Sequence, residues 1–176
     1  MRRGASTLVL APNMLFAKSS KRALIVAILA LPVLPAFAQE RLAYADDLAA
    51  TASEAGKRRV PVMLVFTDAS CPYCARAKRD YLVPLQSRGQ FADKVIVLEV
   101  DVASGRRLRD FAGHITTHRE YAQREQVRKV PTVLVTGTRG EPLAAPIVGL
   151  LAPDFYRLYL EHAVEEGLFK LRAAAR

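Results

Sequence analysis

The stretch VPVMLVFTDASCPYCARAKRD, residues 60–80, joins a run of apolar residues to the only two cysteines in the chain. Residues 60–66 are mostly β-branched or apolar, which is typical of a strand buried on both faces at the centre of a sheet. Pro72 fits the first turn of a helix, where its missing N–H costs nothing, and we expect that helix to continue until Pro84 kinks or ends it. The stretch therefore predicts a central strand that leads through a Cys-x-x-Cys pair into a helix.

The remainder of residues 39–176 alternates helix and strand signals, which predicts one α/β layered domain. A first helix is expected from the capping residues Asp46 and Asp47 to a stop at Gly56. Pro146 cannot donate to a strand ladder, so the last predicted strand should lie at the edge of the sheet. The further strands are expected at residues 94–102, 132–136 and 143–148.

Two more helices are predicted in the second half of the chain. After a looser segment with two glycines, Thr117 and Glu120 form a capping box for a short helix. The last helix opens at Pro153 and is expected to stop at Gly167. Its apolar stripe, at helical spacing, is expected to comprise Phe155, Leu158, Tyr159 and Ala163, with His162 packed on the same stripe.

Residues 1–38 have the pattern of a secretory signal peptide. Basic residues precede the apolar run at residues 23–34, and Ala36-Phe37-Ala38 supplies the small-x-small pattern of a cleavage site. Prolines interrupt the run, and it is shorter than the roughly 18 to 20 residues that a membrane span needs. Met14 would give a leader of more usual length than Met1 and is an alternative start. We therefore expect a periplasmic protein that begins at Gln39 and keeps no stable membrane anchor after cleavage.

Charge points to no special class of partner. The formal net charge of the whole chain is +9, but five of its 26 basic residues lie in the leader, so the mature protein carries about +4 by the same count. Basic residues cluster without the interleaved aromatic residues that a single-strand binding surface uses. No nucleic-acid partner is expected.

The two cysteines are better suited to reaction than to cross-linking. A disulfide that closes so short a loop constrains the unfolded chain little. Cys71 is expected at the N-terminus of a helix, where unpaired N–H groups and the macrodipole favour an anion. Cys74 lies one turn further along and is close enough to attack a mixed disulfide at Cys71. The pattern predicts Cys71 as the nucleophile and Cys74 as the resolving cysteine.

Three short motifs together resemble the thioredoxin superfamily over nearly the whole mature chain. They are TDASCPYC after the first strand, VRKVPT before the third and Gly149 after the fourth. The closest resemblance is to periplasmic thioredoxin-like proteins and Dsb-type thiol–disulfide exchange proteins. It implies a mixed sheet of four or five strands flanked by helices, and a thiol–disulfide oxidoreductase that needs no cofactor. Its partners would be substrate proteins with thiols or disulfides and a redox partner that recycles the dithiol.

The resemblance also implies roles for individual residues. Pro131 would be a cis-proline facing the cysteines, and the backbone of Val130 would pair with an extended substrate segment. Pro72 and Tyr73 would contact substrate beside the nucleophile. Pro-Tyr is also the dipeptide of glutaredoxins, which implies a reduction potential nearer roughly −200 to −230 mV than the −270 mV of thioredoxin.

The chain departs from thioredoxin at the buried acid. Val65 stands where the resemblance places a buried aspartate, and Ser70 replaces the tryptophan before the motif. Asp68 is the nearest candidate for proton transfer, although an aspartate just before a helix is more often a turn or cap residue.

A metal-binding or adaptor module on the same fold is the alternative. His114 and His118 give H-x₃-H and, with the two cysteines, would supply a Cys₂His₂ set. The 39 residues between Cys74 and His114 far exceed the spacer of a zinc finger. Met63, which a copper site would want, is expected in the core. We expect no metal site.

Overall fold

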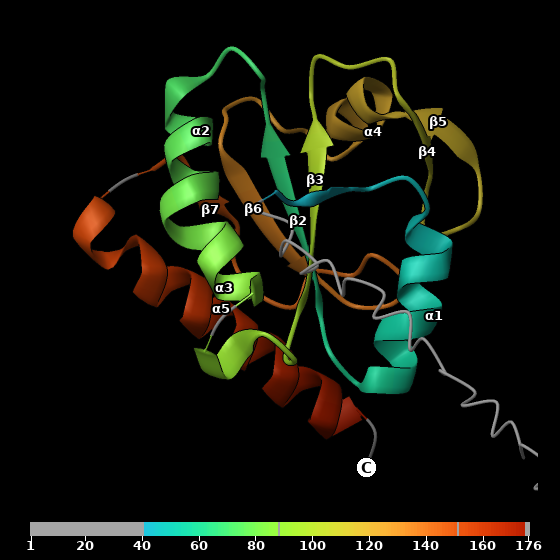
Figure 1. The fold of residues 1–176 in the computed structure, drawn as a ribbon. Coiled ribbons are helices and arrows are strands. Elements are labelled where there is room, and N and C mark those ends of the chain that lie inside the picture. The colour runs from blue at the N-terminus through green and yellow to red at the C-terminus, as the bar shows by residue number, and fades with distance from the viewer. Residues whose placement is uncertain (1–40, 88, 151, 175–176) are drawn as a thin grey trace, which may run out of the picture. The chain divides into compact units, whose positions relative to one another are not determined.

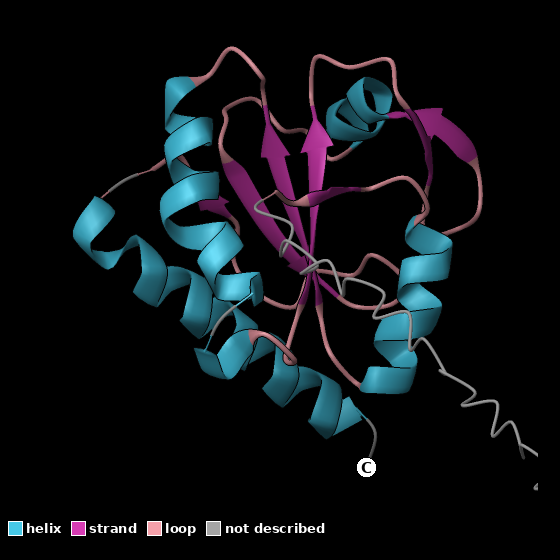
Figure 2. Ribbon diagram, viewed as in Figure 1, coloured by secondary structure: helices cyan, strands magenta, loops and turns pink. Residues whose placement is uncertain are grey.

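The computed structural model describes residues 41–87, 89–150 and 152–174. The predicted leader and its cleavage site lie outside the described residues. The described chain is built on a five-stranded sheet with the strand order β1-β3-β2-β6-β7. The three strands β1, β2 and β3 are parallel, and β6 and β7 run antiparallel to their neighbours (Figure 2). The strands are β1 (Ala43–Tyr44), β2 (Val62–Thr67), β3 (Ile96–Asp101), β6 (Thr132–Thr136) and β7 (Ile147–Val148).

Helices cover both faces of this sheet. Figure 1 shows α2, α3 and α5 over one face and α1 and α4 over the other. The helices are α1 (Leu48–Arg58), α2 (Pro72–Ala77), α3 (Val83–Ser87), α4 (His118–Arg124) and α5 (Pro153–Ala174), with a 3₁₀ turn at Gly89–Phe91. The expected mixed α/β sheet with flanking helices is confirmed. No helix in the described part of the chain is long and apolar enough to cross a membrane.

Strand β2 forms the centre of the core. All six of its residues are buried, as the apolar run predicts. It pairs along its whole length with β3 and over most of its length with β6. Phe66 near its end stacks on Tyr121 of α4 with ring centroids 6.3 Å apart. Because β2 is held on both edges and both faces, the residues that follow it start from a rigid base.

Neither of the two glycines expected to stop a helix does so. Helix α1 passes through Gly56 and ends at Arg58, where Arg59 takes a left-handed conformation and its N–H bonds the carbonyls of Ala55 and Gly56. Helix α5 passes through Gly167, which is buried inside it. A Cβ there would lie 3.1 Å from Cγ1 of Val135, so this glycine permits close packing of the helix on the sheet.

The predicted apolar stripe of α5 is also wrong. Phe155, Leu158 and Tyr159 are each about half exposed, and His162 is exposed as well; of the predicted stripe only Ala163 is buried. The helix carries a second apolar set at equally good helical spacing, and contact with the sheet selects that one. The residues buried instead are Tyr156, Leu160, Val164, Gly167 and Leu168.

Pro84 neither ends nor interrupts the helix that begins at Pro72. A single π-helical turn, Lys78–Leu82, precedes it and joins α2 to α3. There the N–H of Val83 bonds the carbonyl of Lys78, five residues back. Widening the helix in this way accommodates a proline that has no N–H to donate, so the helical path continues to Ser87.

Short strands account for the remaining differences from the predictions. The segment expected to be loose contains a hairpin of β4 (Arg107–Arg109) and β5 (Ile115–Thr117), and β1 was not predicted. Strand β7 lies at the sheet edge, as expected, but only two residues of the predicted range 143–148 pair as a strand. The capping box of Thr117 and Glu120 at the start of α4 is confirmed.

Candidate active site

Cys71 is the N-cap of α2, immediately beyond the loop that follows β2. Its Sγ accepts a hydrogen bond from the backbone N–H of Cys74 at 3.3 Å, and Pro72 occupies the first turn. Both cysteines are free thiols. Cys71 is partly exposed, whereas Cys74 is fully buried. The predicted strand, dithiol and helix arrangement is confirmed, and it leaves Cys71 partly exposed while Cys74 is buried.

Burial gives the two thiols different chemistry. It raises the pKa of Cys74 to about 12, with a further contribution from the hydrogen bond to Cys71. The nearby ammonium of Lys78 acts in the opposite direction. Cys74 is therefore protonated at neutral pH, and the partly exposed Cys71 is the cysteine available for attack on a partner.

The loop before β6 comes within reach of Cys71. The peptide bond between Val130 and Pro131 is cis, the geometry that the family resemblance implies. The Cys71 thiol donates to the carbonyl oxygen of Val130 across 4.0 Å. Two hydrogen bonds of 2.7 Å hold the loop, from the hydroxyl of Thr132 to the carbonyl of Lys129 and from the N–H of Gly149 to the carbonyl of Pro131. Residues far apart in sequence thus form one site.

The other predicted site residues lie around this centre. Pro72 is exposed, and Tyr73 is 63% exposed, so both are accessible to a partner. The Asp68 carboxylate accepts bonds from the N–H and hydroxyl of Ser70, at 2.8 and 2.6 Å. These bonds hold the pKa of Asp68 below its usual value. Its side chain therefore has the turn role that was one of the two roles expected for it.

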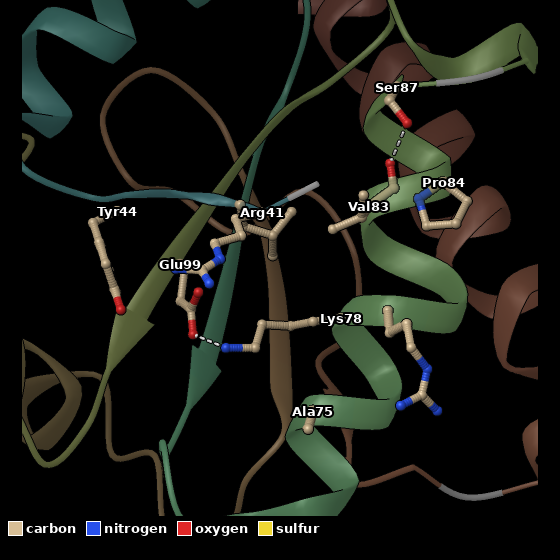
Figure 3. Close-up of a pocket in the computed structure, with 10 residues that line it drawn as sticks. Arg41, Tyr44, Ala75, Lys78, Val83, Pro84, Ser87 and Glu99 are labelled. Atoms are coloured by element: carbon tan, nitrogen blue, oxygen red, sulfur yellow. Dashed lines mark hydrogen bonds and ion pairs between the residues drawn. The ribbon is translucent and has the colours of Figure 1, made fainter. Parts of the chain in front are cut away.

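A partly buried ion pair that the sequence analysis did not predict begins at Lys78, one helical turn from Cys74. Glu99 on β3 is only 5% exposed, and its Oε1 accepts bonds of 2.5 Å from Lys78 Nζ and from the Thr67 hydroxyl. Figure 3 shows Lys78 reaching from the helix to Glu99. Glu99 lies directly opposite Val65 in the strand register. The buried carboxylate absent from the predicted strand is thus present on its neighbour, and a lone acid in the apolar stretch VIVLEV was the available signal.

A cavity of about 540 Å³ opens beside this ion pair. It lies between β1 and the helical segment from Ala75 to Ser87, and Arg41 extends into it toward Glu99 (Figure 3). Apolar side chains such as Leu42 and Val83 line the rest. Lys78 and Glu99 both line the cavity, so solvent can approach the ion pair from this side.

The histidines do not join the cysteines. His118 is fully buried, and its Nδ1 accepts the N–H of Asp101 at 3.0 Å. His114 is exposed, with its ring nitrogen 3.6 Å from an Asp110 carboxylate oxygen. Across residues 41–87, 89–150 and 152–174, no three His, Cys, Asp or Glu side chains gather as metal ligands would. The Cys₂His₂ set considered from the sequence is not assembled. The predicted packing of His162 is likewise not observed.

The buried His118 predicts a dependence of stability on pH. Burial lowers the pKa of His118 below its usual value. As pH falls below about 6.5, His118 becomes protonated in the unfolded chain but stays neutral in the folded chain. Protonation therefore stabilises the unfolded state, and the free energy of unfolding decreases. Urea unfolding measured between about pH 7.5 and pH 5 should show this loss. His118→Asn should flatten the slope, whereas His114→Asn should keep it; equal slopes in the two variants would contradict the assignment.

Comparison with known proteins agrees with the geometry. A family model described as a thioredoxin-like domain matches residues 48–163, well over half of the chain, and this span contains both cysteines and Pro131. The chain belongs to the thioredoxin-like family. The thioredoxin-like domain thus carries its dithiol and its cis-proline within the matched region, and the resemblance noted in the sequence is confirmed.

Several solved structures are similar to this chain at low sequence identity. A thioredoxin-fold protein from Helicobacter pylori is similar with a TM-score of 0.55 and 17% identity, over 78% of this chain and 91% of that one. Mitochondrial thioredoxin 3 from Saccharomyces cerevisiae has a TM-score of 0.48 and 17% identity, over 71% and 94%. The DsbD C-terminal domain from Neisseria meningitidis has a TM-score of 0.45 and 17% identity, over 69% and 99%. No curated protein sequence matches the chain.

Proposed function

We propose that this protein is a Dsb-type thiol–disulfide oxidoreductase that exchanges disulfides with substrate proteins through Cys71 and Cys74. The observation that carries the proposal is the partly exposed Cys71 at the start of α2, whose sulfur lies 4.0 Å from the Val130 carbonyl oxygen and 3.3 Å from the backbone nitrogen of the buried Cys74. The predicted leader at residues 1–38 supports a periplasmic location, where substrate proteins carry disulfides.

The reaction proceeds through a mixed disulfide. The Cys71 thiolate attacks one sulfur of a substrate disulfide, the substrate S–S bond breaks, and the other substrate sulfur leaves as a thiolate that takes up a proton. Cys74 then loses its proton and attacks the Cys71 sulfur, which releases the second substrate thiol and leaves a Cys71–Cys74 disulfide. The substrate gains two electrons and two protons. The reverse sequence oxidises a substrate dithiol, and a redox partner restores the starting state.

The residues around the dithiol have distinct parts in this exchange. The backbone of Val130 pairs with an extended substrate segment, and Pro131 keeps that backbone facing Cys71. Pro72 and Tyr73 offer exposed surface to the substrate beside the nucleophile. The ion pair of Lys78 and Glu99 assists the departure of the proton from Cys74, because its positive end favours the Cys74 thiolate.

The direct test follows both cysteines through one reaction. The reduced protein is mixed with a disulfide-bonded protein, quenched with acid and alkylated, and the mass of the chain is measured. We expect the two alkyl groups of the reduced protein to be lost together as the substrate gains two thiols. Persistent alkylation of both cysteines would contradict the proposal. Stoichiometric zinc or copper that protects both thiols would favour the metal-binding module instead.

Removing the charge of Lys78 should slow the second step selectively. In Lys78→Gln the pKa of Cys74 is expected to rise, because the ammonium that opposes the effect of burial is gone. Resolution of the mixed disulfide should slow several-fold while the first attack by Cys71 changes little. Rapid-quench measurement of both steps tests this. Lys170→Gln, at an exposed ion pair on α5, is the matched control; equal slowing of both steps would refute a specific role for Lys78.

A further inference from the structure

Two positively charged residues directly precede Val130, whose carbonyl oxygen faces Cys71. Arg128 and Lys129 precede Val130 in the loop that leads into β6, and both side chains are exposed. Neither forms a salt bridge with any residue that the structure describes, whereas Arg106, Arg109 and Arg124 each lie within 4.0 Å of an acidic oxygen. The loop therefore carries charge that the fold itself does not neutralise.

A groove of about 420 Å³ begins at these two residues. Its apolar floor comes from β6 and from the segment that ends in β7, through Leu134, Pro146 and Val148. Val148 is 42% exposed, which leaves an apolar surface open at the edge of the sheet. We call this the cationic groove and define it by Arg128, Lys129, Leu134, Pro146 and Val148.

One acidic residue also lines the cationic groove. It is Glu125, and desolvation raises the pKa of its carboxyl while the guanidinium of Arg124 acts against that rise. Even a fully ionised Glu125 offsets only one of the two positive charges. The net charge of the groove is therefore positive.

The cationic groove adjoins the site of exchange through the chain itself, because Lys129, which lines the groove, directly precedes Val130. The Val130 carbonyl lies 4.0 Å from the Cys71 sulfur, and the hydroxyl of Thr132 fixes the carbonyl of Lys129 next to it. Thr132 in turn lies opposite Val148 in the pairing of β6 with β7. A substrate segment that pairs with the backbone of Val130 would therefore pass next to Lys129, where the groove begins.

We propose that the cationic groove binds the segment beside the reactive cysteine of a partner polypeptide, and that it favours partners with Asp or Glu and apolar residues in that segment. This inference rests on the proposed exchange activity and adds the class of partner. Opposite charges on the two surfaces speed association and disfavour wrong partners, and salt weakens both effects. Burial of apolar partner residues against the floor of the groove adds binding free energy to that of the charges.

Three disulfide-bonded peptides test the proposal with the full-length protein. They are identical except that the two residues beside the cysteine are Glu-Glu, Gln-Gln or Lys-Lys. The second-order rate constant for reduction of each is measured at low and high salt. We expect the Glu peptide to react about tenfold faster than the Lys peptide at low salt, the scale of electrostatic steering, and the ratio to shrink at high salt.

Charge reversal locates the effect. In the double variant R128E/K129E the order of the Glu and Lys peptides should invert. The matched control is K57E/R59E, which makes the same change in net charge at two exposed residues. These residues precede β2, whereas the cysteines follow the other end of that strand. The control should keep the wild-type order. If all three peptides are reduced at equal rates, or if R128E/K129E keeps the wild-type order, the groove proposal is overturned alone. If the wild type reduces none of them, the proposed exchange activity is overturned with it.

Discussion

Cys71→Ser is expected to lower the rate of disulfide exchange by roughly a thousandfold or more, the scale on which loss of a catalytic nucleophile acts. The remaining thiol cannot substitute, because Cys74 is fully buried and its pKa is raised to about 12. At neutral pH Cys74 is therefore almost entirely in its unreactive thiol form.

Reduction of a disulfide-bonded protein, followed as release of free thiols, measures this loss. Ser70→Ala serves as a matched control, since it alters a hydroxyl one residue from Cys71 without touching either sulfur. The variant Cys71→Ser should also leave the fold intact, which circular dichroism checks. Exchange at close to the wild-type rate in Cys71→Ser would mean that the accessible sulfur is not the nucleophile.

Cys74→Ser is expected to block the second step of the exchange and leave the first step intact. Cys71 still attacks a substrate disulfide, but no internal thiol resolves the mixed disulfide, so the covalent complex accumulates. Non-reducing electrophoresis and the mass of the adduct should show close to one substrate chain per protein. The reductant dithiothreitol should release it.

Two further variants sharpen this result. The double variant Cys71→Ser/Cys74→Ser should form no complex. Cys71→Ser alone should also form none, because its remaining cysteine, Cys74, is buried. Complexes that form through Cys74 in the absence of Cys71 would reverse the two roles. Turnover of Cys74→Ser at the wild-type rate, with no adduct, would remove the resolving step from the mechanism.

The central part of the site could be predicted from sequence because its signals are local. An apolar run predicts a buried strand, and Pro72 marks the first turn of a helix, so the position of Cys71 between them follows from neighbouring residues. The capping box of Thr117 and Glu120 is local for the same reason. Such features depend on backbone preferences within a few residues, and they were confirmed.

The ion pair of Lys78 and Glu99 could not be predicted from local sequence patterns. Glu99 was visible as an acid within an apolar strand, but its proximity to Lys78 depends on the register between β2 and β3 and on the path of the helix over them. The π-helical turn at Lys78–Leu82, which begins at that lysine, could not be predicted from the sequence either. Neither the register nor the turn follows from the spacing of residues along one segment.

By itself, the sequence determined the dithiol at a strand–helix junction, the order of the main elements and the edge position of β7, since each follows from short-range preferences of apolar, proline and capping residues. Only the tertiary structure decided which stripe of α5 is buried, because Phe155 and Tyr156 begin equally regular stripes and packing against Val135 and Pro61 selects the second. It also decided that Val130 lies beside Cys71. Burial and long-range proximity depend on surfaces that exist only once separate elements have packed together.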